Sequence, residues 1–207
     1  METLIRQLVD RFLHGIEDSP YIRPDLITRV SDLVIVSGSC ELYSPGVMGA
    51  EVVDVPSGRY PVYVGTFASQ WARPPEAVPD WQIASTLFVP LAEPERIAGA
   101  RTDDELAHVG LWVEGYVTLN DEEALQQAWR LPSDPIQGQP MKGFLRDVEG
   151  SVKAGQLGAP STWPSFVVDD KSGWNVLAVP MVDGFLYAVR WTDDEELLAV
   201  MYLTFAN

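Results

Sequence analysis

Residues 185–205, FLYAVRWTDDEELLAVMYLTF, carry the clearest structural pattern in the chain. Large apolar residues occupy alternate positions of the first seven residues: Phe185, Tyr187, Val189 and Trp191. This period of two is typical of a β-strand with two different faces. The acidic group 192–195 is typical of a turn, and the return segment 197–205 is apolar on both faces, as in a central strand. We therefore expect a β-hairpin whose second strand lies inside a sheet.

Similar strand and turn segments fill residues 32–118. Segments rich in β-branched and aromatic residues are separated by turns of Ser, Gly and Pro, and predict strands at 33–36, 51–55, 60–64 and 81–89. The alternating pattern from Val109 to Val117 predicts one further strand. Three prolines between Ala72 and Pro79 predict an exposed irregular loop.

Three other segments have helical spacing. Residues 2–16 form an amphipathic pattern with one apolar stripe. The group Asn120-Asp121-Glu122-Glu123 resembles a capping box with Asn120 as the N-cap, and predicts a helix to about Trp129. Pro140 suits the first turn of another helix, and the apolar side of that helix would carry Phe144, Leu145, Val148 and Val152.

These elements predict a single α+β domain over residues 1–207. We expect a mostly antiparallel sheet, an N-terminal amphipathic helix and two or three further helices. The order along the chain is an N-terminal helix (2–16), a β-rich part (32–118), a helical part (120–156) and a C-terminal β-hairpin region (163–206). A length of 207 residues suits one domain with a substantial core.

The charge balance excludes several classes of partner. Thirty acidic and 14 basic residues give a net charge of −16, which disfavours binding to nucleic acid or to an anionic membrane. A hydrophobic content of 46% nevertheless indicates a folded domain and not a disordered acidic tail. The single cysteine and the absence of a signal-peptide pattern at the start of the sequence favour a cytoplasmic location.

Motifs for catalysis and cofactor binding are absent from the sequence. There is no Gly-x-Ser-x-Gly elbow, no glycine-rich phosphate loop and no set of ligands with zinc or calcium spacing. We therefore assign no catalytic residue, no metal and no cofactor. Cys40 is interpreted as a small buried hydrophobe, and His14 and His108 as structural or solvated residues. Carboxylates brought together in space remain an open alternative as acid/base catalysts.

Acidic residues are concentrated between Thr102 and Pro135, where eight acids face one base, Arg130. Such a segment would attract a basic partner and speed its association. The alternative is that these residues serve turns, helix caps and solubility. The candidate partner-binding residues are Asp103, Asp104, Glu105, Glu114, Asp121, Glu122 and Glu123.

The segments Val53 to Val64 and Ile83 to Val89 resemble an uncharacterised bacterial family known as domain of unknown function 4241. The resemblance extends over about residues 33–205. Two places depart from the family pattern: Asn175-Val176-Leu177 stands where Gly-Asp-Gly is expected, and Cys40-Glu41-Leu42 stands where an Asp-Pro pair is usual. The resemblance implies an α+β fold and a bacterial origin, and it transfers no catalytic residue.

Charge, composition and the lack of catalytic motifs favour a non-enzymatic protein that binds a basic protein partner in the cytoplasm. Its most concrete form is a bacterial immunity protein or antitoxin that occludes the active site of a basic toxin. The alternative is a small-molecule-binding protein or a hydrolytic enzyme that uses carboxylates clustered in space. A concave pocket with two or more buried carboxylates of raised pKa would favour this alternative, whereas a flat acidic face would favour the binding protein.

Overall fold

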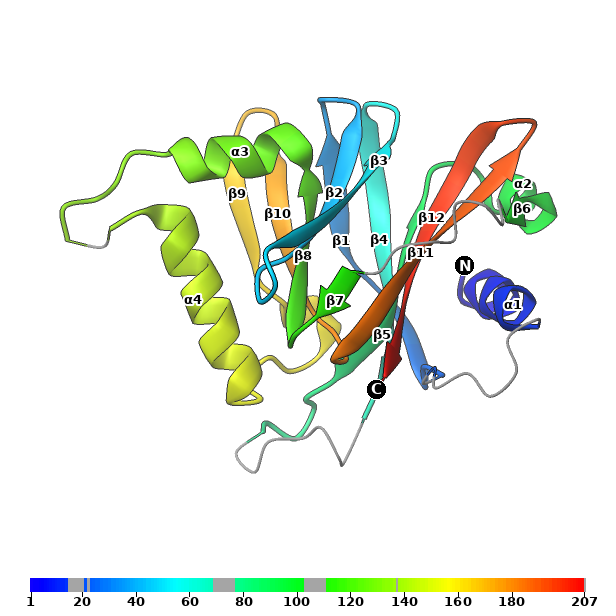
Figure 1. Ribbon diagram of the computed structural model, residues 1–207, viewed down its shortest axis with the longest axis horizontal. Coiled ribbons are helices and arrows are strands. Elements are labelled where there is room, and N and C mark those ends of the chain that lie inside the picture. The colour runs from blue at the N-terminus through cyan, green and yellow to red at the C-terminus, as the bar shows by residue number, and fades with distance from the viewer. Residues whose placement is uncertain (15–20, 22, 69–76, 103–110, 137, 207) are drawn as a thin grey trace.

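Two antiparallel β-sheets lie face to face in the computed structural model, with helices on both outer sides (Figure 1). The structure describes residues 1–14, 21, 23–68, 77–102, 111–136 and 138–206. The first sheet has the spatial order β1 (Leu26–Ile35), β4 (Gly58–Phe67), β5 (Ile83–Pro90), β12 (Glu196–Ala206), β11 (Gly184–Asp193) and β6 (Arg101–Thr102). A short strand, β7 (Leu111–Val113), also pairs with β11.

The second sheet has five strands, in the order β3 (Gly49–Asp54), β2 (Ser39–Ser44), β8 (Tyr116–Asp121), β10 (Trp174–Pro180) and β9 (Ser165–Asp169). Among the described residues, α1 (Glu2–Leu13) and α2 (Pro94–Gly99) cover the outer side of the first sheet. The outer side of the second sheet carries α3 (Glu122–Arg130) and α4 (Pro140–Lys153), and a 3₁₀ turn, η1 (Pro160–Thr162), precedes β9. The result is four layers, which confirms the predicted single-domain α+β class (Figure 1).

Three sets of buried apolar contacts hold the layers together. The largest lies between the sheets and includes Leu42, Leu87, Leu119 and Tyr202. A second set joins α1 and α2 to the first sheet, and smaller clusters join α3 and α4 to the second sheet. Burial of apolar surface is the main favourable term in folding, and each sheet contributes to it on both of its faces.

The predicted C-terminal hairpin is confirmed. Asp194 and Glu195 adopt positive φ angles of 44° and 68° in the two-residue turn between β11 and β12, which suits the twist of the adjoining strands. The return strand β12 lies between β5 and β11. Its Tyr202 packs between the sheets, whereas the neighbouring Met201 packs toward the α1 layer, which explains why the segment is apolar at successive positions.

The single strand predicted from Val109 to Val117 is wrong for its described part. Leu111–Val113 and Tyr116–Asp121 are two strands that belong to different sheets. The chain reverses at Glu114 and Gly115, where Gly115 has a φ of +74°, a conformation that glycine adopts without steric cost. Alternation of apolar residues continues through this turn, because both strands face the same core.

Two further details correct the expectations from sequence. Asp121, and not Asn120, is the N-cap of α3, since its carboxylate accepts the backbone N–H groups of Glu123 and Ala124. Cys40 lies inside a strand, β2, that the turn-like composition of residues 37–40 concealed. The helix predicted over 2–16 is observed as Glu2–Leu13, and the helix that starts at Pro140 is confirmed.

The loop predicted at 72–79 lies mostly outside the described residues. Within the described part of the chain, every helix is too short or too polar to cross a membrane.

Candidate functional site

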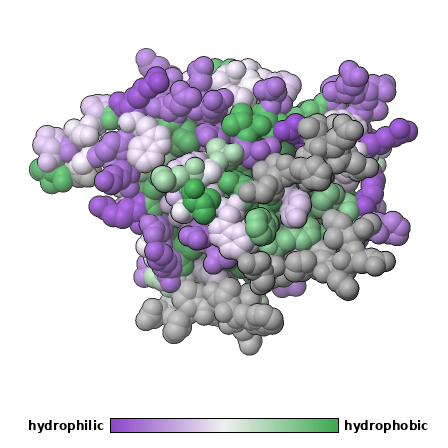
Figure 2. Space-filling view, in the orientation of Figure 1, coloured by the Kyte–Doolittle hydropathy of each residue, from purple (hydrophilic) through white to green (hydrophobic). Residues whose placement is uncertain are grey.

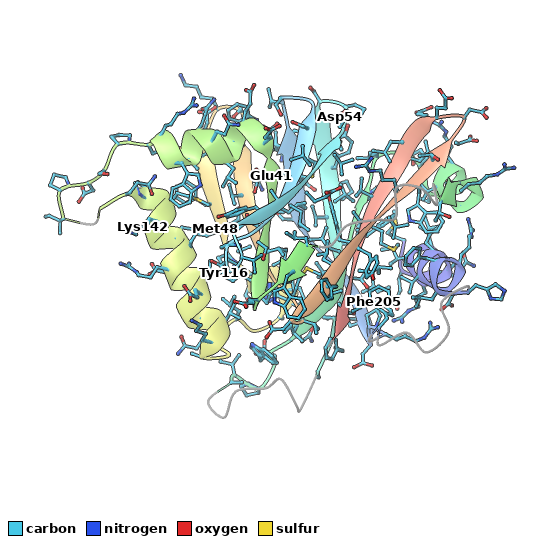
Figure 3. The ribbon with its side chains drawn as sticks, in the orientation of Figure 1. Glu41, Met48, Asp54, Tyr116, Lys142 and Phe205 are labelled. Carbon is cyan, nitrogen blue, oxygen red and sulfur yellow. The ribbon has the colours of Figure 1, made fainter. Side chains whose placement is uncertain are left out.

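A cleft of about 860 Å³ opens where the two sheets and the C-terminal part of α4 meet. Its position can be followed in Figure 3 from Tyr116, at the end of β8 that lies beside β7. The walls come from five segments that are far apart in the sequence. The lining residues are Pro45, Gly46, Trp81, Ile83, Trp112, Glu114, Gly115, Tyr116, Glu149, Val152, Lys153, Val182 and Asp183.

The turn between β7 and β8 forms one wall of the cleft, and hydrogen bonds hold its backbone. The Gly115 N–H donates to Asp183 Oδ1 at 2.6 Å, and the Gly115 carbonyl accepts from the Met181 N–H at 3.0 Å. Gly46 lies against the Glu114 side chain so closely that a Cβ there would be 3.0 Å from the Glu114 Cβ. The turn, and with it Glu114, is therefore fixed between β10–β11 and the β2–β3 hairpin.

Three aromatic residues of the described part of the chain line the cleft: Trp81, Trp112 and Tyr116. The Trp112 ring meets Phe185 edge to face, with 4.9 Å between the ring centroids and an interplanar angle of 85°. Apolar and near-neutral residues accordingly gather at the centre of the face shown in Figure 2, over β7 and the adjoining end of β11. Trp81 is buried, and its indole N–H has no acceptor among the described residues.

The Tyr116 hydroxyl is held beneath α4, where it donates to the Leu145 carbonyl at 3.2 Å. Burial, together with the negative charge of Glu149, raises the pKa of Tyr116 to about 12. The phenol is therefore neutral at physiological pH. It is therefore a poor general base.

Among the described residues, three carboxylates and one ammonium group line the cleft, an excess of negative charge. Glu149 is paired with Lys153, whose Nζ lies 2.5 Å from Oε1, and Asp183 uses one oxygen to hold the turn. The pKa of Lys153 is raised by the hydrogen bond that its ammonium group donates to Glu149, and by the charges of Glu149 and Glu114. The Glu114 carboxylate makes no hydrogen bond or ion pair with any other described residue, so both of its oxygens are available.

The structure separates the residues that the sequence grouped as one acidic segment. Asp103, Asp104 and Glu105 lie outside the described residues. Glu114 lines the cleft, whereas Glu122 and Glu123 follow the opposite end of β8. Because β8 has six residues and a strand rises about 3.3 Å per residue, roughly 20 Å separates the two ends. Glu114 and Glu123 therefore lie toward opposite ends of β8, and their assignment to partner binding stays a prediction.

Asp121 is fully buried and cannot contact a partner. Besides capping α3, it accepts the N–H groups of Val36 at 2.6 Å and Ser37 at 2.8 Å through Oδ2. Its carboxylate thus joins the end of β1 to the start of α3, and we remove it from the partner-binding set. Glu122 is half-buried and accepts a hydrogen bond from Ser39 Oγ, while Glu123 is exposed.

The carboxylates with raised pKa lie elsewhere. Burial raises the pKa of Glu41 and of Glu51, although a hydrogen bond from Asn120 opposes the shift at Glu41 and the charge of Arg190 opposes it at Glu51. Glu51 faces β11 through its ion pair with Arg190, whereas Glu41 faces Asn120 and Glu122 beside α3. Neither residue lines the cleft, so the acids with raised pKa do not meet there.

The single cysteine and the two histidines lie apart from the cleft wherever the structure describes them. Cys40 is buried, as expected, and burial raises the pKa of its thiol to about 12. His14 is exposed after the last turn of α1, and His108 lies outside the described residues. No group of three or more His, Cys, Asp or Glu within the described ranges is arranged to hold a metal ion.

Sequence reasoning missed most of the cleft. Trp112, Tyr116, Glu149 and Asp183 had no common motif, because they come from three separate regions of the chain. The one available signal was Glu114-Gly115, an acidic residue and a glycine that interrupt an otherwise strand-like segment. That pair marks both the turn and the free carboxylate.

Comparisons of the chain with protein-family models, curated proteins and solved structures found no match. The resemblance to domain of unknown function 4241 stays a prediction.

Proposed function

We propose that this chain is a non-enzymatic, acidic, cytoplasmic protein that binds a basic protein partner. In its most concrete form it is a bacterial immunity protein or antitoxin that occludes the active site of a basic toxin. The observation that carries the proposal is the free carboxylate of Glu114 at a cleft walled by aromatic rings. Aromatic residues are enriched at interface hot spots, and carboxylates around them select a partner of positive charge.

Two further features support this proposal. The net charge of −16 would accelerate encounter with a cation at low ionic strength. Next to the cleft, Met48 is 82% exposed at the tip of the β2–β3 hairpin (Figure 3). Phe185 is 46% exposed and contacts the Trp112 ring. Exposed apolar side chains around an acidic cleft are typical of an interaction surface, and their burial slows dissociation of a bound partner.

The alternative function, an enzyme with paired carboxylates, has less support. Acid/base catalysis near neutral pH favours a carboxylate of raised pKa beside a second group in one cavity. Glu41 and Glu51 have raised pKa values but face different parts of the fold. The volume of the cleft is the feature that favours a small-molecule ligand, since about 860 Å³ falls within the range of ligand pockets.

The test is co-purification from the native cell followed by kinetics with the recovered partner. We expect a basic protein, and we expect Glu114→Lys to slow association by about tenfold at low salt, with a smaller effect at high salt. Glu95→Lys is the matched control, because it makes the same change of charge at an exposed site on α2, which covers the outer side of the first sheet. A partner that is not basic, or equal association rates for the two variants, would contradict the proposal.

A further inference from the structure

We propose that the cleft binds the side chain of one arginine, with its guanidinium group against the Trp112 ring and paired with Glu114. This inference rests on the proposed function, because it names the group through which a basic partner is recognised. It goes further in assigning a ligand chemistry and a binding site to individual residues of the cleft.

The charges of the cleft point to a cation that donates hydrogen bonds. The two oxygens of Glu114 make no hydrogen bond with a described residue, and Asp183 and Glu149 each use one oxygen within the fold. An ionised carboxylate accepts hydrogen bonds and cannot donate them. A ligand that satisfies these carboxylates must therefore bring N–H or O–H donors. Charge-assisted hydrogen bonds of this kind are stronger than those between neutral groups. A quaternary ammonium ligand lacks such donors and would leave Glu114 without a partner.

The walls favour a guanidinium group over a primary ammonium group. Besides the three rings, the lining includes Ile83, Val152 and Val182, so much of the surface is apolar. A guanidinium is planar and weakly hydrated, and it can stack on a ring while donating in its own plane to a carboxylate. The ammonium of lysine is compact and strongly hydrated, and loses more solvation in such a site.

The size of the cleft and its surroundings favour an arginine within a polypeptide over the free amino acid. A volume of about 860 Å³ exceeds what one side chain fills and leaves room for the flanking backbone. Phe185 and Met48 provide exposed apolar surface for neighbouring residues of the partner. The Trp81 N–H has no acceptor among the described residues, and a peptide carbonyl of the partner is a group that would accept from it.

Lys153 acts as an internal competitor for the same carboxylates. Its Nζ is paired with Glu149 and interacts electrostatically with Glu114. It therefore neutralises part of the negative charge that would attract the arginine. Removal of this ammonium should therefore strengthen arginine binding. Lys142 provides the control, because it lies on α4 at the end remote from Lys153 and does not line the cleft (Figure 3).

The experiment is a titration of the full chain with N-acetyl-arginine amide at low ionic strength, followed by the indole N–H resonances of the seven tryptophans. Trp112→Phe identifies the Trp112 resonance. N-acetyl-lysine amide and N-acetyl-leucine amide are the comparison ligands. We expect saturable shifts centred on Trp112 with a Kd on the order of 1–10 mM, as suits a single-residue ligand. The lysine compound should bind at least threefold more weakly, and the leucine compound should produce no saturable shift.

The variants make the assignment specific. We expect Glu114→Gln to weaken the arginine compound at least fivefold and Lys153→Met to strengthen it at least twofold. Glu95→Gln, at an exposed site on α2 that does not line the cleft, and Lys142→Met should leave the Kd within a factor of 1.5. An unchanged Kd for Glu114→Gln, equal binding of the leucine compound, or no saturable shift of Trp112 at 50 mM ligand would each overturn the arginine site.

Failure of this inference can be distinguished from failure of the proposed function. If the arginine compound does not bind but Glu114→Lys still slows association of the native basic partner, the partner is recognised without an arginine in the cleft. If the compound binds as expected and the native partner is not basic, the arginine site stands and the proposed function is wrong.

Discussion

Replacement of Asp121 should destabilise the whole domain, because this one carboxylate holds two elements together. Its Oδ1 accepts the N–H groups of Glu123 and Ala124 in the first turn of α3, at 2.9 and 3.1 Å. Its Oδ2 accepts those of Val36 and Ser37 after the end of β1, at 2.6 and 2.8 Å. Asp121→Ala therefore leaves four backbone donors without their acceptor.

The magnitude follows from these four hydrogen bonds. Loss of a side-chain N-cap costs about 1 kcal/mol of stability. Each of the two other donors is partly buried, and loss of its charged acceptor costs about 1 kcal/mol more. We therefore expect Asp121→Ala to lower the free energy of unfolding by about 3 kcal/mol. A serine at this position can still cap α3 but is too short to hold the end of β1. Asp121→Ser should therefore lower the free energy of unfolding by about 2 kcal/mol.

Urea unfolding, monitored by tryptophan fluorescence, measures these differences. With an m value of about 2–3 kcal/mol/M, a loss of 3 kcal/mol moves the midpoint down by about 1–1.5 M. Glu123→Gln changes an exposed acid in the same helical turn and should stay within about 0.5 kcal/mol of the parent. A loss below 1 kcal/mol for Asp121→Ala, or equal losses for the alanine and serine variants, would refute this account of the site.

Three other perturbations have defined outcomes. Gly115→Ala should lower the free energy of unfolding in urea by about 1–2 kcal/mol, because alanine is strained at a φ of +74°. The new Cβ would make only an ordinary contact with Val152, so a steric clash adds nothing. An unchanged urea midpoint would contradict a strained turn. Cys40 should resist a thiol reagent at pH 8 in the native state and react fully in urea, because burial raises the pKa of its thiol to about 12. Rapid labelling of the native protein would show that β2 opens. Glu41 has a raised pKa in the folded state, so its contribution to stability is present below about pH 4.5, its unfolded value, and is lost as the pH rises through the folded value. Glu41→Gln should therefore be more stable than the parent at pH 7, and this difference should shrink toward pH 4; a difference independent of pH would exclude Glu41 as its source.

The sequence was most informative where local patterns and tertiary structure agree. The pattern 185–205 predicted a hairpin with a central return strand, and β11 and β12 form it because the alternation and the turn residues suit the same geometry. Likewise, Pro140 marked the start of α4. These features depend on residues that are neighbours in sequence.

Local patterns failed where one signal had two structural explanations. The alternation through Val117 continued across Glu114-Gly115, so a turn between two sheets had the period of a single strand. The acids 121–123 looked like one charged group, but a strand and a helix cap divide them into a buried residue, a half-buried residue and an exposed one. Burial depends on what packs above a residue, and this cannot be read from the residue's own neighbours in sequence.

By itself, the sequence determined the α+β class, an excess of negative charge and the periodic elements, because composition and hydrophobic spacing act over a few residues at a time. Only the tertiary structure decided which acids remain free. It enclosed the carboxylate of Asp121 among four backbone amides and left that of Glu114 open beside Trp112 and Tyr116. The physical reason is that a charged group is either satisfied within the fold or available to a ligand according to the donors that distant segments bring to it.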